Sequence, residues 1–467
     1  MLRVVYRSTR CIPILSWSGR KLLHSDSRFI TLNGRQYERD DWTNVPSSIL
    51  EATSRRLHHQ PAHPIALIRQ AIESRFPRAE YNLYNDLAPV VTVHQNFDSL
   101  GFAPDHPGRS RTDTYYLNKR HVLRTHTSAH EAECFKINKT EGFLITADVY
   151  RRDAIDRTHY PAFHQMEGAR LWDRKSSTSG LVAEAALQDI RKIPVHNMKV
   201  HDPAPDPDPS VNPIQTVHAR AEAEAIAYHL KRTLEDVIHQ LFVLANLTSK
   251  MPELRWVETF FPHTSPSYEL EIMHQSEWLE VLGCGVISQP LLDNASVPDK
   301  LGWAFGMGLE RIAMLLFGIP DIRLFWSRDS RFLGQFSTDS SHISQFVPFS
   351  KYPPCPKDLA FWLPDRGESI NGGTPKAAGA QELGQRKSGA QDFHENDFME
   401  VARELGGDLV EDVQLVDEFK HPKTGRRSVC YRIVYRSLER TLTNEEVKKL
   451  HQAIAEKVRD TLQVELR

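Results

Sequence analysis

The chain has 467 residues, with 58 Lys or Arg residues against 60 Asp or Glu residues, and a formal net charge of −2. This length predicts two or three domains, and no run of apolar residues approaches the roughly 18 that a membrane span needs. The five cysteines lie far apart without a Cys-x-x-Cys pair, which argues against a disulfide framework and a structural zinc site.

The first 25 residues contain five basic residues and no acidic residue, with apolar residues between them. An arginine-rich, acid-poor amphipathic start is typical of a mitochondrial presequence. A disordered basic segment is the alternative interpretation. We therefore predict a presequence over residues 1–25 and a first folded domain over residues 26–345.

Three histidines, His58, His59 and His63, lie close together near the start of a helix predicted over residues 64–76. No carboxylate or cysteine stands at ligand spacing, and nearby prolines break the helix that would align the imidazoles, so we expect no metal site here. The helix has one apolar stripe, which predicts packing against a core.

A cluster of hydroxyl and imidazole side chains at residues 126–131 follows the apolar end of a strand. Such side chains can form the floor of a pocket. A helix N-cap at Thr127 or Ser128 is the alternative interpretation, and the two are compatible.

A strand and its return strand are predicted around a polar turn in the next part of the chain. The first strand, residues 143–151, is apolar and β-branched until it reaches Arg151 and Arg152. The return strand is predicted to start near Tyr160.

Along the return strand, side chains alternate between the two faces of the sheet, so Phe163, Gln165 and Glu167 share one face. An aromatic ring, an amide and a carboxylate in a row suit a site that stacks a base, orients a polar ligand and holds an ammonium group. Arg151 can form a two-pronged contact with a phosphate or a carboxylate. An ordinary polar hairpin with a satisfied salt bridge is the alternative interpretation.

The middle of the chain contains no candidate catalytic or binding residues that we can identify from the sequence. The acidic, proline-rich run at residues 201–209 predicts a surface loop that is disordered at its tip. Leucines and other apolar residues repeat at helical spacing over residues 221–247, which predicts a long helix packed on a sheet.

Two more strands are predicted over residues 255–272 and 277–286. In the second strand, Glu280 shares a face with the apolar residues two positions before and after it. A carboxylate with apolar neighbours needs a partner or a bound cation.

A strand runs into a helix within residues 301–318, through Gly306 and Gly308, where the backbone must turn tightly or approach a ligand. The helix opens with Glu310 and Arg311. An arginine in the first turn lies at the positive end of the helix dipole, which is unfavourable for stability but suits the binding of a polyanion. A surface arginine with a packed aliphatic stem is the alternative interpretation.

From residue 350 to residue 467 the predicted order is strand, helix, strand, strand, helix, strand, which is ferredoxin-like. Residues 420–440 hold seven basic residues against one acidic residue, and Arg432 and Arg436 share the strand face that is free to bind RNA. A solvated hairpin is the alternative interpretation. The Gly/Ala/Lys-rich insert at residues 371–391 is predicted to be disordered.

Several of these segments occur together in one known family. Residues 148–167 and 301–318 resemble motifs two and three of the class II aminoacyl-tRNA synthetases. The flanking segments resemble phenylalanyl-tRNA synthetases: His126-Thr-Ser-Ala-His130, residues 149–159, Phe163-His-Gln-Met-Glu-Gly168, residues 278–285, 321–325 and 331–333. Because catalytic segments and a C-terminal anticodon-binding domain lie on one chain, the resemblance is to the single-chain mitochondrial form, from Ile30 onward. Several long segments in the right order are far more specific than a lone glycine pattern.

The resemblance implies an α+β protein: a class II catalytic domain with an antiparallel sheet, followed by a ferredoxin-like anticodon-binding domain. It implies that phenylalanine and ATP form phenylalanyl-adenylate and diphosphate, and that the acyl group then passes to the 3′ end of tRNA(Phe) with release of AMP. It also implies ATP and Mg²⁺ as cofactors, no membrane partner, a monomer and a location in the mitochondrial matrix.

The resemblance further implies roles for individual residues. Arg151 and Arg311 are the expected catalytic residues, with Arg151 between the substrate carboxylate and the α-phosphate. Arg311 and His159 are expected at the distal phosphates, Phe163 against adenine, and Glu280 on the magnesium side of the site. Arg432 and Arg436 are the expected tRNA contacts.

At the amino-acid end, Ser128, Gln165 and Glu167 are expected to hold the substrate ammonium group. The complete set of expected substrate-binding residues, in which Phe261, Ala304 and Phe305 line the ring pocket, is Ser128, Ala129, His130, Glu131, Arg151, Thr158, His159, Tyr160, Phe163, Gln165, Met166, Glu167, Phe261, Glu280, Ala304 and Phe305.

One position departs from the family pattern. His263 stands where the family commonly has a second phenylalanine, and its imidazole brings a nitrogen that needs a partner. Two other interpretations remain open at this point: a catalytically inactive RNA-binding relative, and a class II synthetase for another amino acid.

Overall fold

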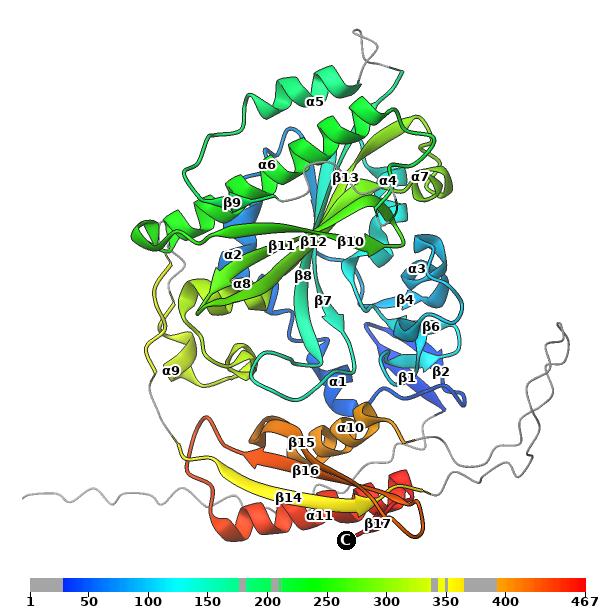
Figure 1. Ribbon diagram of the computed structural model, residues 1–467, viewed down its shortest axis with the longest axis vertical. Helices are drawn as coiled ribbons and strands as arrows, with labels where there is room; N and C mark the ends of the chain where they lie inside the picture. The colour runs from blue at the N-terminus through cyan, green and yellow to red at the C-terminus, as the bar shows by residue number, and fades with distance from the viewer. Residues whose placement is uncertain are drawn as a thin grey trace, which may run out of the picture.

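The computed structural model describes residues 28–175, 182–202, 210, 212–336, 343–348, 352–364 and 393–467. These residues form two domains, which lie one above the other in Figure 1. The presequence predicted at residues 1–25 and the insert predicted at residues 371–391 lie outside the described residues, as do residues 203–209 of the acidic loop.

An eight-stranded sheet forms the centre of the N-terminal domain (Figure 1). Its strands, in order across the sheet, are β3 (Tyr81–Tyr84), β7 (Gly142–Tyr150), β8 (Ala162–Asp173), β13 (Lys300–Gly308), β12 (Glu277–Ile287), β11 (Thr264–His274), β10 (Leu254–Phe261) and β9 (Val200–His201). The two outermost pairs are parallel and all pairs between them are antiparallel. The predicted α+β fold with an antiparallel catalytic sheet is confirmed.

Helices cover one face of this sheet. The long helix α6 (Arg220–Leu244) packs on β12 and β13, and α2 (Pro64–Glu73) and α8 (Leu309–Phe317) pack beside it. α5 (Val182–Ile190) lies outside α6 (Figure 1). The apolar stripe of α6 and the large side chains of the sheet meet in one core, in which Trp303 is fully buried. Burial of each such side chain contributes roughly 1.5–3 kcal/mol to stability, so this face is committed to packing.

Shorter elements complete the N-terminal domain. They are β1 (Phe29–Leu32), β2 (Arg35–Glu38), α1 (Ser47–Ala52), η1 (Leu57–His59), β4 (Val90–Thr92), α3 (Val93–Asn96), η2 (Asp98–Leu100), η3 (Pro107–Arg109), β5 (Tyr116–Asn118), β6 (His121–Leu123), η4 (Thr127–His130), α4 (Glu131–Ile137), η5 (Thr248–Lys250), α7 (Gln289–Asn294), η6 (Ile322–Trp326) and α9 (Ser330–Leu333). No helix within the described ranges has both the length and the apolar character needed to cross a membrane.

Two strand predictions were wrong in the region that forms the site. The single strand predicted over residues 255–272 is a hairpin of β10 and β11, because its turn at Pro262 and His263 contains no glycine and does not interrupt the aromatic run. In β12, the register shifts between the pairs Leu270–Leu282 and Glu271–Glu280. This β-bulge turns Glu280 away from the face of Leu282, onto the face of Glu271.

The C-terminal domain has the predicted ferredoxin-like order, which the structure confirms. Its elements are β14 (Cys355–Trp362), α10 (Glu395–Gly406), η7 (Gly407–Leu409), β15 (Val410–Lys420), β16 (Arg427–Tyr435), α11 (Asn444–Leu462) and β17 (Glu465–Leu466), with the strand order β15-β16-β14-β17. Alternate side chains of β16, including Tyr431 and Ile433, are buried in the core under the helices. Arg432, between them, lies on the other face of the sheet.

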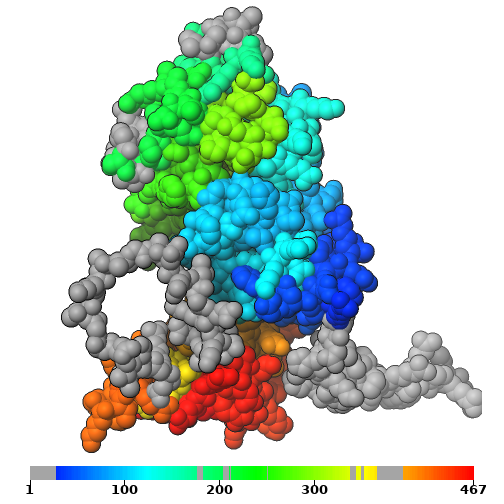
Figure 2. Space-filling view, turned by 90° about the vertical axis from the view of Figure 1, so that its right-hand side faces the viewer, coloured from blue at the N-terminus to red at the C-terminus, as the bar shows by residue number. Residues whose placement is uncertain are grey.

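The loop between β7 and β8, residues 151–161, lies against the C-terminal domain. Ile155 is buried in the apolar core of that domain together with Phe398 and Val413. The amide of Val413 donates a hydrogen bond of 3.0 Å to the carbonyl oxygen of Ile155. In the space-filling view, the orange and red C-terminal domain sits directly below the blue and cyan segments of the N-terminal domain (Figure 2).

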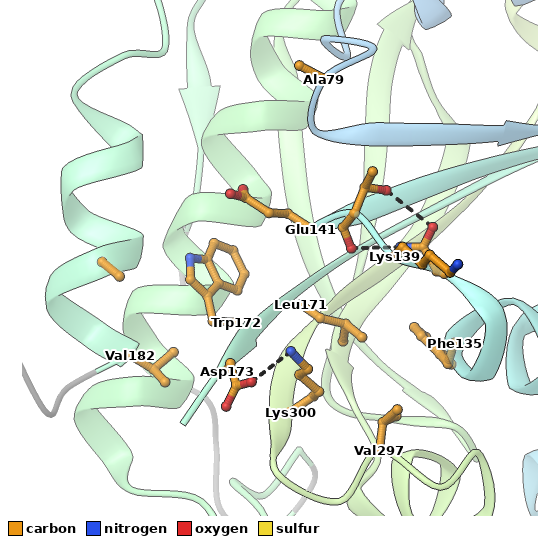
Figure 3. Close-up of a pocket in the computed structure, with 13 residues that line it drawn as sticks. Ala79, Phe135, Lys139, Glu141, Leu171, Trp172, Asp173, Val182, Val297 and Lys300 are labelled. Atoms are coloured by element: carbon orange, nitrogen blue, oxygen red, sulfur yellow. Dashed lines mark hydrogen bonds and ion pairs between the residues drawn. The ribbon is translucent and has the colours of Figure 1, made fainter. Parts of the chain in front are cut away.

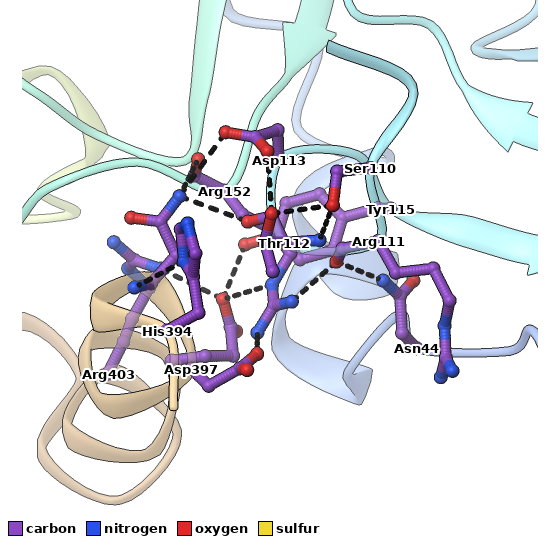
Figure 4. A network of polar contacts seen from close by, with 12 residues as sticks. Asn44, Ser110, Arg111, Thr112, Asp113, Tyr115, Arg152, His394, Asp397 and Arg403 are labelled. Carbon is purple, nitrogen blue, oxygen red and sulfur yellow. Dashed lines mark hydrogen bonds and ion pairs between the residues drawn. The ribbon is translucent and has the colours of Figure 1, made fainter. Parts of the chain in front are cut away.

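Polar contacts surround this apolar one, between helix α10 and the N-terminal domain (Figure 4). Arg152 forms ion pairs with Asp397 at 3.0 Å and with Glu400 at 3.6 Å. Arg403 donates hydrogen bonds to the carbonyl oxygens of Asp153 and Ala154 at 2.5 and 3.4 Å. Removing one partner of a buried ion pair typically costs about 3–5 kcal/mol, so these contacts fix one docking geometry for the loop.

Candidate active site

The open face of the sheet carries a trough made by glycines. In register across four strands, Glu167 of β8 pairs with Gly306 of β13, which pairs with Gly283 of β12, which pairs with Glu269 of β11. Residues paired in register point to the same face of a sheet. The two central positions have no side chain, so the row from Glu167 to Glu269, which we call the trough, leaves space above the backbone for side chains from neighbouring positions.

Each glycine of the trough makes room for one side chain. A Cβ atom at Gly283 would lie 2.6 Å from Cζ of Phe261, and a Cβ atom at Gly306 would lie 2.6 Å from Nε2 of Gln165. Both distances are shorter than any ordinary contact, so Phe261 and Gln165 lie over the trough only because residues 283 and 306 are glycines.

The end of the trough at Glu167 is rich in hydroxyl donors. Thr127 donates a hydrogen bond of 2.8 Å to one carboxylate oxygen of Glu167, and Ser128 lies 2.8 Å from both oxygens. Glu131 lies within electrostatic reach of Glu167, and its two buried oxygens have no hydrogen-bond partner in the described part of the chain. Burial raises the pKa of both groups, and for Glu131 the Glu167 carboxyl group adds to that rise.

Aromatic rings form a wall above the other part of the trough. The ring of His263 stacks on Phe261, with centroids 6.0 Å apart, and on Phe102 at 6.4 Å. Phe102 in turn stacks on His126 at 5.7 Å. Nδ1 of His263 is buried and has no hydrogen-bond partner within the described part of the chain, and burial lowers the pKa of this imidazole to about 4. The wall is therefore uncharged and aromatic at neutral pH.

Two arginines stand at the end of β7 and at the start of α8. The Arg151 guanidinium lies 5.3 Å from the ring centre of Phe163, and its Nε donates a hydrogen bond of 2.8 Å to the carbonyl oxygen of Thr125. Arg311 Nη1 donates to the carbonyl oxygen of Glu280 at 2.7 Å and lies 3.9 Å from its carboxylate. Both cations lie within electrostatic reach of Glu280, and they repel each other. A bound polyanion would relieve that repulsion.

The charged form of His159 is favoured by its own loop. Its Nδ1 lies 2.6 Å from Oδ2 of Asp156, and this hydrogen bond raises the pKa of His159 above its usual value. Burial acts to raise the pKa of Asp156, but hydrogen bonds from His159 and Thr158 outweigh it and lower that pKa. Asp156 therefore favours a positive charge on the same loop as Arg151.

The side chains of three predicted substrate-binding residues do not reach the trough. Met166 and Phe305 are buried in the core under the helices, where the ring of Phe305 packs on Phe76 at 6.1 Å. Tyr160 stacks on Trp326 and donates a hydrogen bond of 3.0 Å to Asp408 in the C-terminal domain. Strand neighbours alternate between faces, so a continuous motif places some side chains away from the open face. Substrate binding by these three residues stays a prediction.

The side chains of the predicted cluster at residues 128–131 also point in different directions. Ser128 and Glu131 contact Glu167, but Ala129 is buried in a separate apolar cluster with Val122. His130 Nε2 lies 2.9 Å from the guanidinium of Arg124, behind the trough. Thr158 donates its hydroxyl hydrogen to Asp156 and is exposed. Of these residues, Ser128 and Glu131 interact with Glu167 through their side chains, and the assignment of the others as substrate-binding residues stays a prediction.

The two predicted RNA contacts, Arg432 and Arg436, differ in their exposure and in their ion-pair partners. Arg432 is exposed and forms a two-pronged ion pair with Asp358 at 2.7 and 2.8 Å. Arg436 lies 3.0 Å from the buried carboxylate of Glu411, next to Arg323 and the domain contact. The partner of Arg436 lies in the neighbouring strand β15, and periodicity along β16 alone does not reveal it. RNA contact by these two arginines stays a prediction.

Phe102 and His126 of the aromatic wall, and the role of Thr127 as a donor to Glu167, were not predicted from the sequence. Thr127 and His126 belong to a segment that was singled out, but nothing in it showed which side chains turn toward Glu167. Phe102 follows a turn, and no periodic pattern marks it. The sequence feature that could have indicated the trough is a glycine in each of two strands, Gly283 and Gly306. This feature is informative only when the two strands are known to be neighbours.

The three histidines near the start of α2 contact backbone carbonyl groups. His58 and His59 contact the carbonyl oxygen of Asn85, and His63 contacts that of Phe325. In the ranges that the structure describes, no three His, Cys, Asp or Glu side chains lie close enough to hold a metal ion. A separate cavity of about 510 Å³ lies near the far ends of β8 and β13, beside the Lys300–Asp173 ion pair of 3.0 Å (Figure 3). None of the predicted site residues lines it.

Comparison with known proteins identifies both domains. The family model of the class II tRNA synthetase core domain (F) matches residues 49–190 and 219–336, and that of the ferredoxin-fold anticodon-binding domain matches residues 350–467.

Close relatives cover nearly the whole chain. It is 45% identical to the mitochondrial phenylalanine–tRNA ligase of Saccharomyces cerevisiae, over 94% of this chain and 95% of that protein. It is 39% identical to the Mus musculus counterpart, over 100% of this chain and 96% of that protein. It is 41% identical to the chloroplastic/mitochondrial phenylalanine–tRNA ligase of Arabidopsis thaliana, over 92% of this chain and 84% of that protein. The chain therefore belongs to the phenylalanine–tRNA ligase family of the class II aminoacyl-tRNA synthetases.

Proposed function

We propose that the protein joins phenylalanine to the 3′ end of tRNA(Phe) in two ATP-driven steps, inside mitochondria. The observation that supports this most is the glycine trough, which has buried carboxyl groups at one end and the rings of Phe261 and His263 at its wall. An ammonium group and an aromatic ring on one small ligand match those two features. The names of the relatives point to the same substrates.

The first step activates the amino acid. A carboxylate oxygen of phenylalanine attacks the α-phosphorus of ATP, a new O–P bond forms, and diphosphate leaves with the bridging oxygen. Arg151 would neutralise the carboxylate and the α-phosphate, Arg311 and His159 would bind the distal phosphates, and Phe163 would stack on adenine. No covalent bond to the protein is needed, so alignment and charge neutralisation carry the catalysis.

At the amino-acid end, Glu167, Gln165 and Ser128 would hold the ammonium group. Ala304 lies on the same face of the sheet, one row away from Gly306, and Phe261 closes the pocket from above. These residues would set the distance between the substrate carboxylate and Arg151.

Class II aminoacyl-tRNA synthetases use ATP together with divalent metal ions, and we propose Mg²⁺ here. Glu280 and Glu271 are paired in register on the open face, and Glu269 lies two residues from Glu271 on that face. Carboxylate oxygens are the ligands that Mg²⁺ prefers, and Mg²⁺ bound with ATP usually takes only one or two of them from the protein. Glu280 is the proposed ligand, since it also contacts Arg311.

The second step transfers the acyl group to tRNA. A hydroxyl group of the terminal ribose attacks the carbonyl carbon of the adenylate, and AMP leaves. The anticodon-binding domain would supply the more distant contacts, with Arg432 as the proposed phosphate contact.

We further propose a monomer in the mitochondrial matrix. Catalytic and anticodon-binding domains lie on one chain and bury apolar and ionic groups against each other, so no second copy is needed to bring them together. The basic, acid-poor composition of residues 1–25 supports import.

Amino-acid-dependent exchange of labelled diphosphate into ATP tests the proposal. Exchange with phenylalanine, and weak or no exchange with the other nineteen standard amino acids, is expected. Arg311→Ala should lose most of this exchange, since a charged contact to a transferring phosphate in a shielded site contributes several kcal/mol. Arg459→Ala, which removes an exposed arginine of α11, is the matched control.

The same assay separates the two alternatives. A catalytically inactive relative would show no exchange with any amino acid, and a synthetase of different specificity would respond to another one. Near-normal exchange in Arg311→Ala would remove that residue from the mechanism.

A further inference from the structure

Two buried carboxyl groups meet at the ammonium end of the trough. Glu131, the first residue of α4, is fully buried, and Glu167 is only 2% exposed. Glu131 lies within electrostatic reach of Glu167, and neither Glu131 oxygen has a hydrogen-bond partner in the described part of the chain. An ionised carboxylate that is buried without a donor, beside a second carboxyl group, is strongly unfavourable, so the pair holds a proton.

Hydrogen-bond donors are distributed unequally over this pair. Glu167 accepts from the hydroxyl groups of Thr127 and Ser128, each at 2.8 Å. Neither oxygen of Glu131 accepts a hydrogen bond from an N–H or hydroxyl group in the described part of the chain. Donors stabilise the ionised form of a carboxyl group. Glu167 is therefore the carboxylate, and Glu131 is the neutral acid beside it.

The surroundings supply little compensating charge. Phe143 and Ile145 of β7, Leu291 of α7 and Ala304 of β13 belong to one apolar cluster with the buried residues of α4. The other titratable or charged groups at this end of the domain are Glu133 and Cys134 on α4, His126 and His130 of the preceding turn, Arg124 and Asp148 behind His130, His263 in the β10–β11 turn, and Arg151 at the end of β7.

None of these groups competes for the proton near neutral pH. Burial lowers the pKa of His126 well below its usual value, that of His130 to about 3 and that of His263 to about 4, so all three imidazoles are neutral. Burial raises the pKa of the Cys134 thiol, to which the nearby glutamates add. Arg124 is paired with Asp148 at 2.8 Å.

We infer that Glu131 and Glu167 share one proton in the free enzyme, and that binding of the substrate's ammonium group expels that proton to solvent. This inference rests on the proposed function. The ammonium group keeps its three protons and donates to the carboxylates, so the pair changes from one negative charge to two as one positive charge arrives. Amino-acid recognition is thereby coupled to pH.

The direction of the coupling follows from linkage. Because the free pair holds a proton that the complex lacks, raising the pH favours the complex. Between the pKa of the pair in the complex and its pKa in the free enzyme, affinity for phenylalanine should rise by up to about tenfold per pH unit. Glu131→Gln keeps the shape and a hydrogen-bond donor but has no proton to lose, so its affinity should not change with pH.

Titration calorimetry of the whole chain with phenylalanine measures the released proton directly. Two buffers with different ionisation enthalpies, used at about pH 7, give the number of protons released per ligand bound. We expect close to one proton for the wild type and close to none for Glu131→Gln. 3-Phenylpropanoate, which lacks the ammonium group, should release none from the wild type.

Infrared difference spectroscopy of the wild type provides a measurement that needs no variant. The carbonyl band of a neutral carboxylic acid should disappear when phenylalanine binds. Binding without proton release and without loss of that band would overturn the inference alone. Failure of phenylalanine to bind at any pH would overturn the proposed substrate as well.

Discussion

Gly283 gives the ring of Phe261 the space to lie over the trough. In Gly283→Ala, the new methyl group would lie 2.6 Å from Phe261 and would push the ring into the space proposed for the substrate. Overpacking of this kind typically costs about 1–3 kcal/mol. We expect the KM for phenylalanine in diphosphate exchange to rise at least tenfold, with the KM for ATP little changed.

A double variant checks that the ring is the cause. Adding Phe261→Leu to Gly283→Ala removes ring atoms and should recover part of the lost affinity for phenylalanine. If Gly283→Ala had a normal KM for phenylalanine, Phe261 would not line the amino-acid pocket.

The Asp156–His159 pair predicts how activity depends on pH. Asp156 raises the pKa of His159, so the charged form that can bind phosphate is present at low pH and is lost as the pH rises through that raised pKa. In Asp156→Asn the amide still accepts the backbone hydrogen bonds, but the pKa of His159 falls. We expect the alkaline decline in exchange rate to move to lower pH.

His159→Gln is the control for this assignment, because a neutral side chain at that position should remove the alkaline decline. An identical pH profile in the wild type and in Asp156→Asn would mean that His159 does not act as a cation in the first step.

At the scale of the element, β16 carries two arginines with different roles. Arg436→Glu would place a carboxylate beside Glu411, which is 2% exposed, and should destabilise the protein by about 3–5 kcal/mol. Arg432→Glu would face only the exposed Asp358, and its effect on stability should be within about 1 kcal/mol. Urea unfolding measures both effects.

Assays of diphosphate exchange and of tRNA charging should also distinguish the two variants. Arg432→Glu is expected to retain diphosphate exchange and to charge tRNA more slowly, with the defect largest at low salt, where phosphate contacts contribute most. Equal charging by Arg432→Glu and the wild type would place the RNA contacts of this domain elsewhere.

Strand periodicity explains how much of the site was predictable. It put Phe163, Gln165 and Glu167 on one face correctly, because β8 is regular over that stretch. It misplaced Glu280 because the bulge at Val281 depends on how β11 and β12 pair, which sequence does not show. Phe305 was assigned together with its neighbour Ala304, although adjacent strand residues cannot share a face.

The order of elements in both domains was predictable because it depends on local patterns, whereas contacts between distant segments do not. Long helices and regular strands are local patterns, and the sequence predicts a helix over residues 444–462, which are the bounds of α11. The contact between Ile155 and the C-terminal core, like the Arg436–Glu411 pair, joins segments that share no local pattern.

At the scale of the whole molecule, Ile155 should make the two domains unfold together. In Ile155→Asp, a carboxylate would enter the apolar core of the C-terminal domain, where an unpaired charge is strongly unfavourable. We expect the wild type to unfold in a single calorimetric transition and Ile155→Asp to show two, with the C-terminal domain melting first. Diphosphate exchange should also slow, since Ile155 lies on the loop that begins with Arg151.

Leu415→Asp is the matched control, because Leu415 lies in β15 but is 46% exposed. This variant should keep the single transition and the normal exchange rate. If Ile155→Asp behaved in the same way, the loop would not depend on the C-terminal domain.

The docking of this loop also bears on how the protein is synthesised. Arg157 of the loop contacts Glu411 of β15, 254 positions later in the chain. Ribosomes make the chain from its N-terminus, so both arginines proposed for catalysis emerge long before the strand that supports one of them. A polypeptide that terminates early, before β15, would carry the catalytic sequence segments but leave the loop without its support. Only a chain that includes β15 can therefore hold this loop in its docked position.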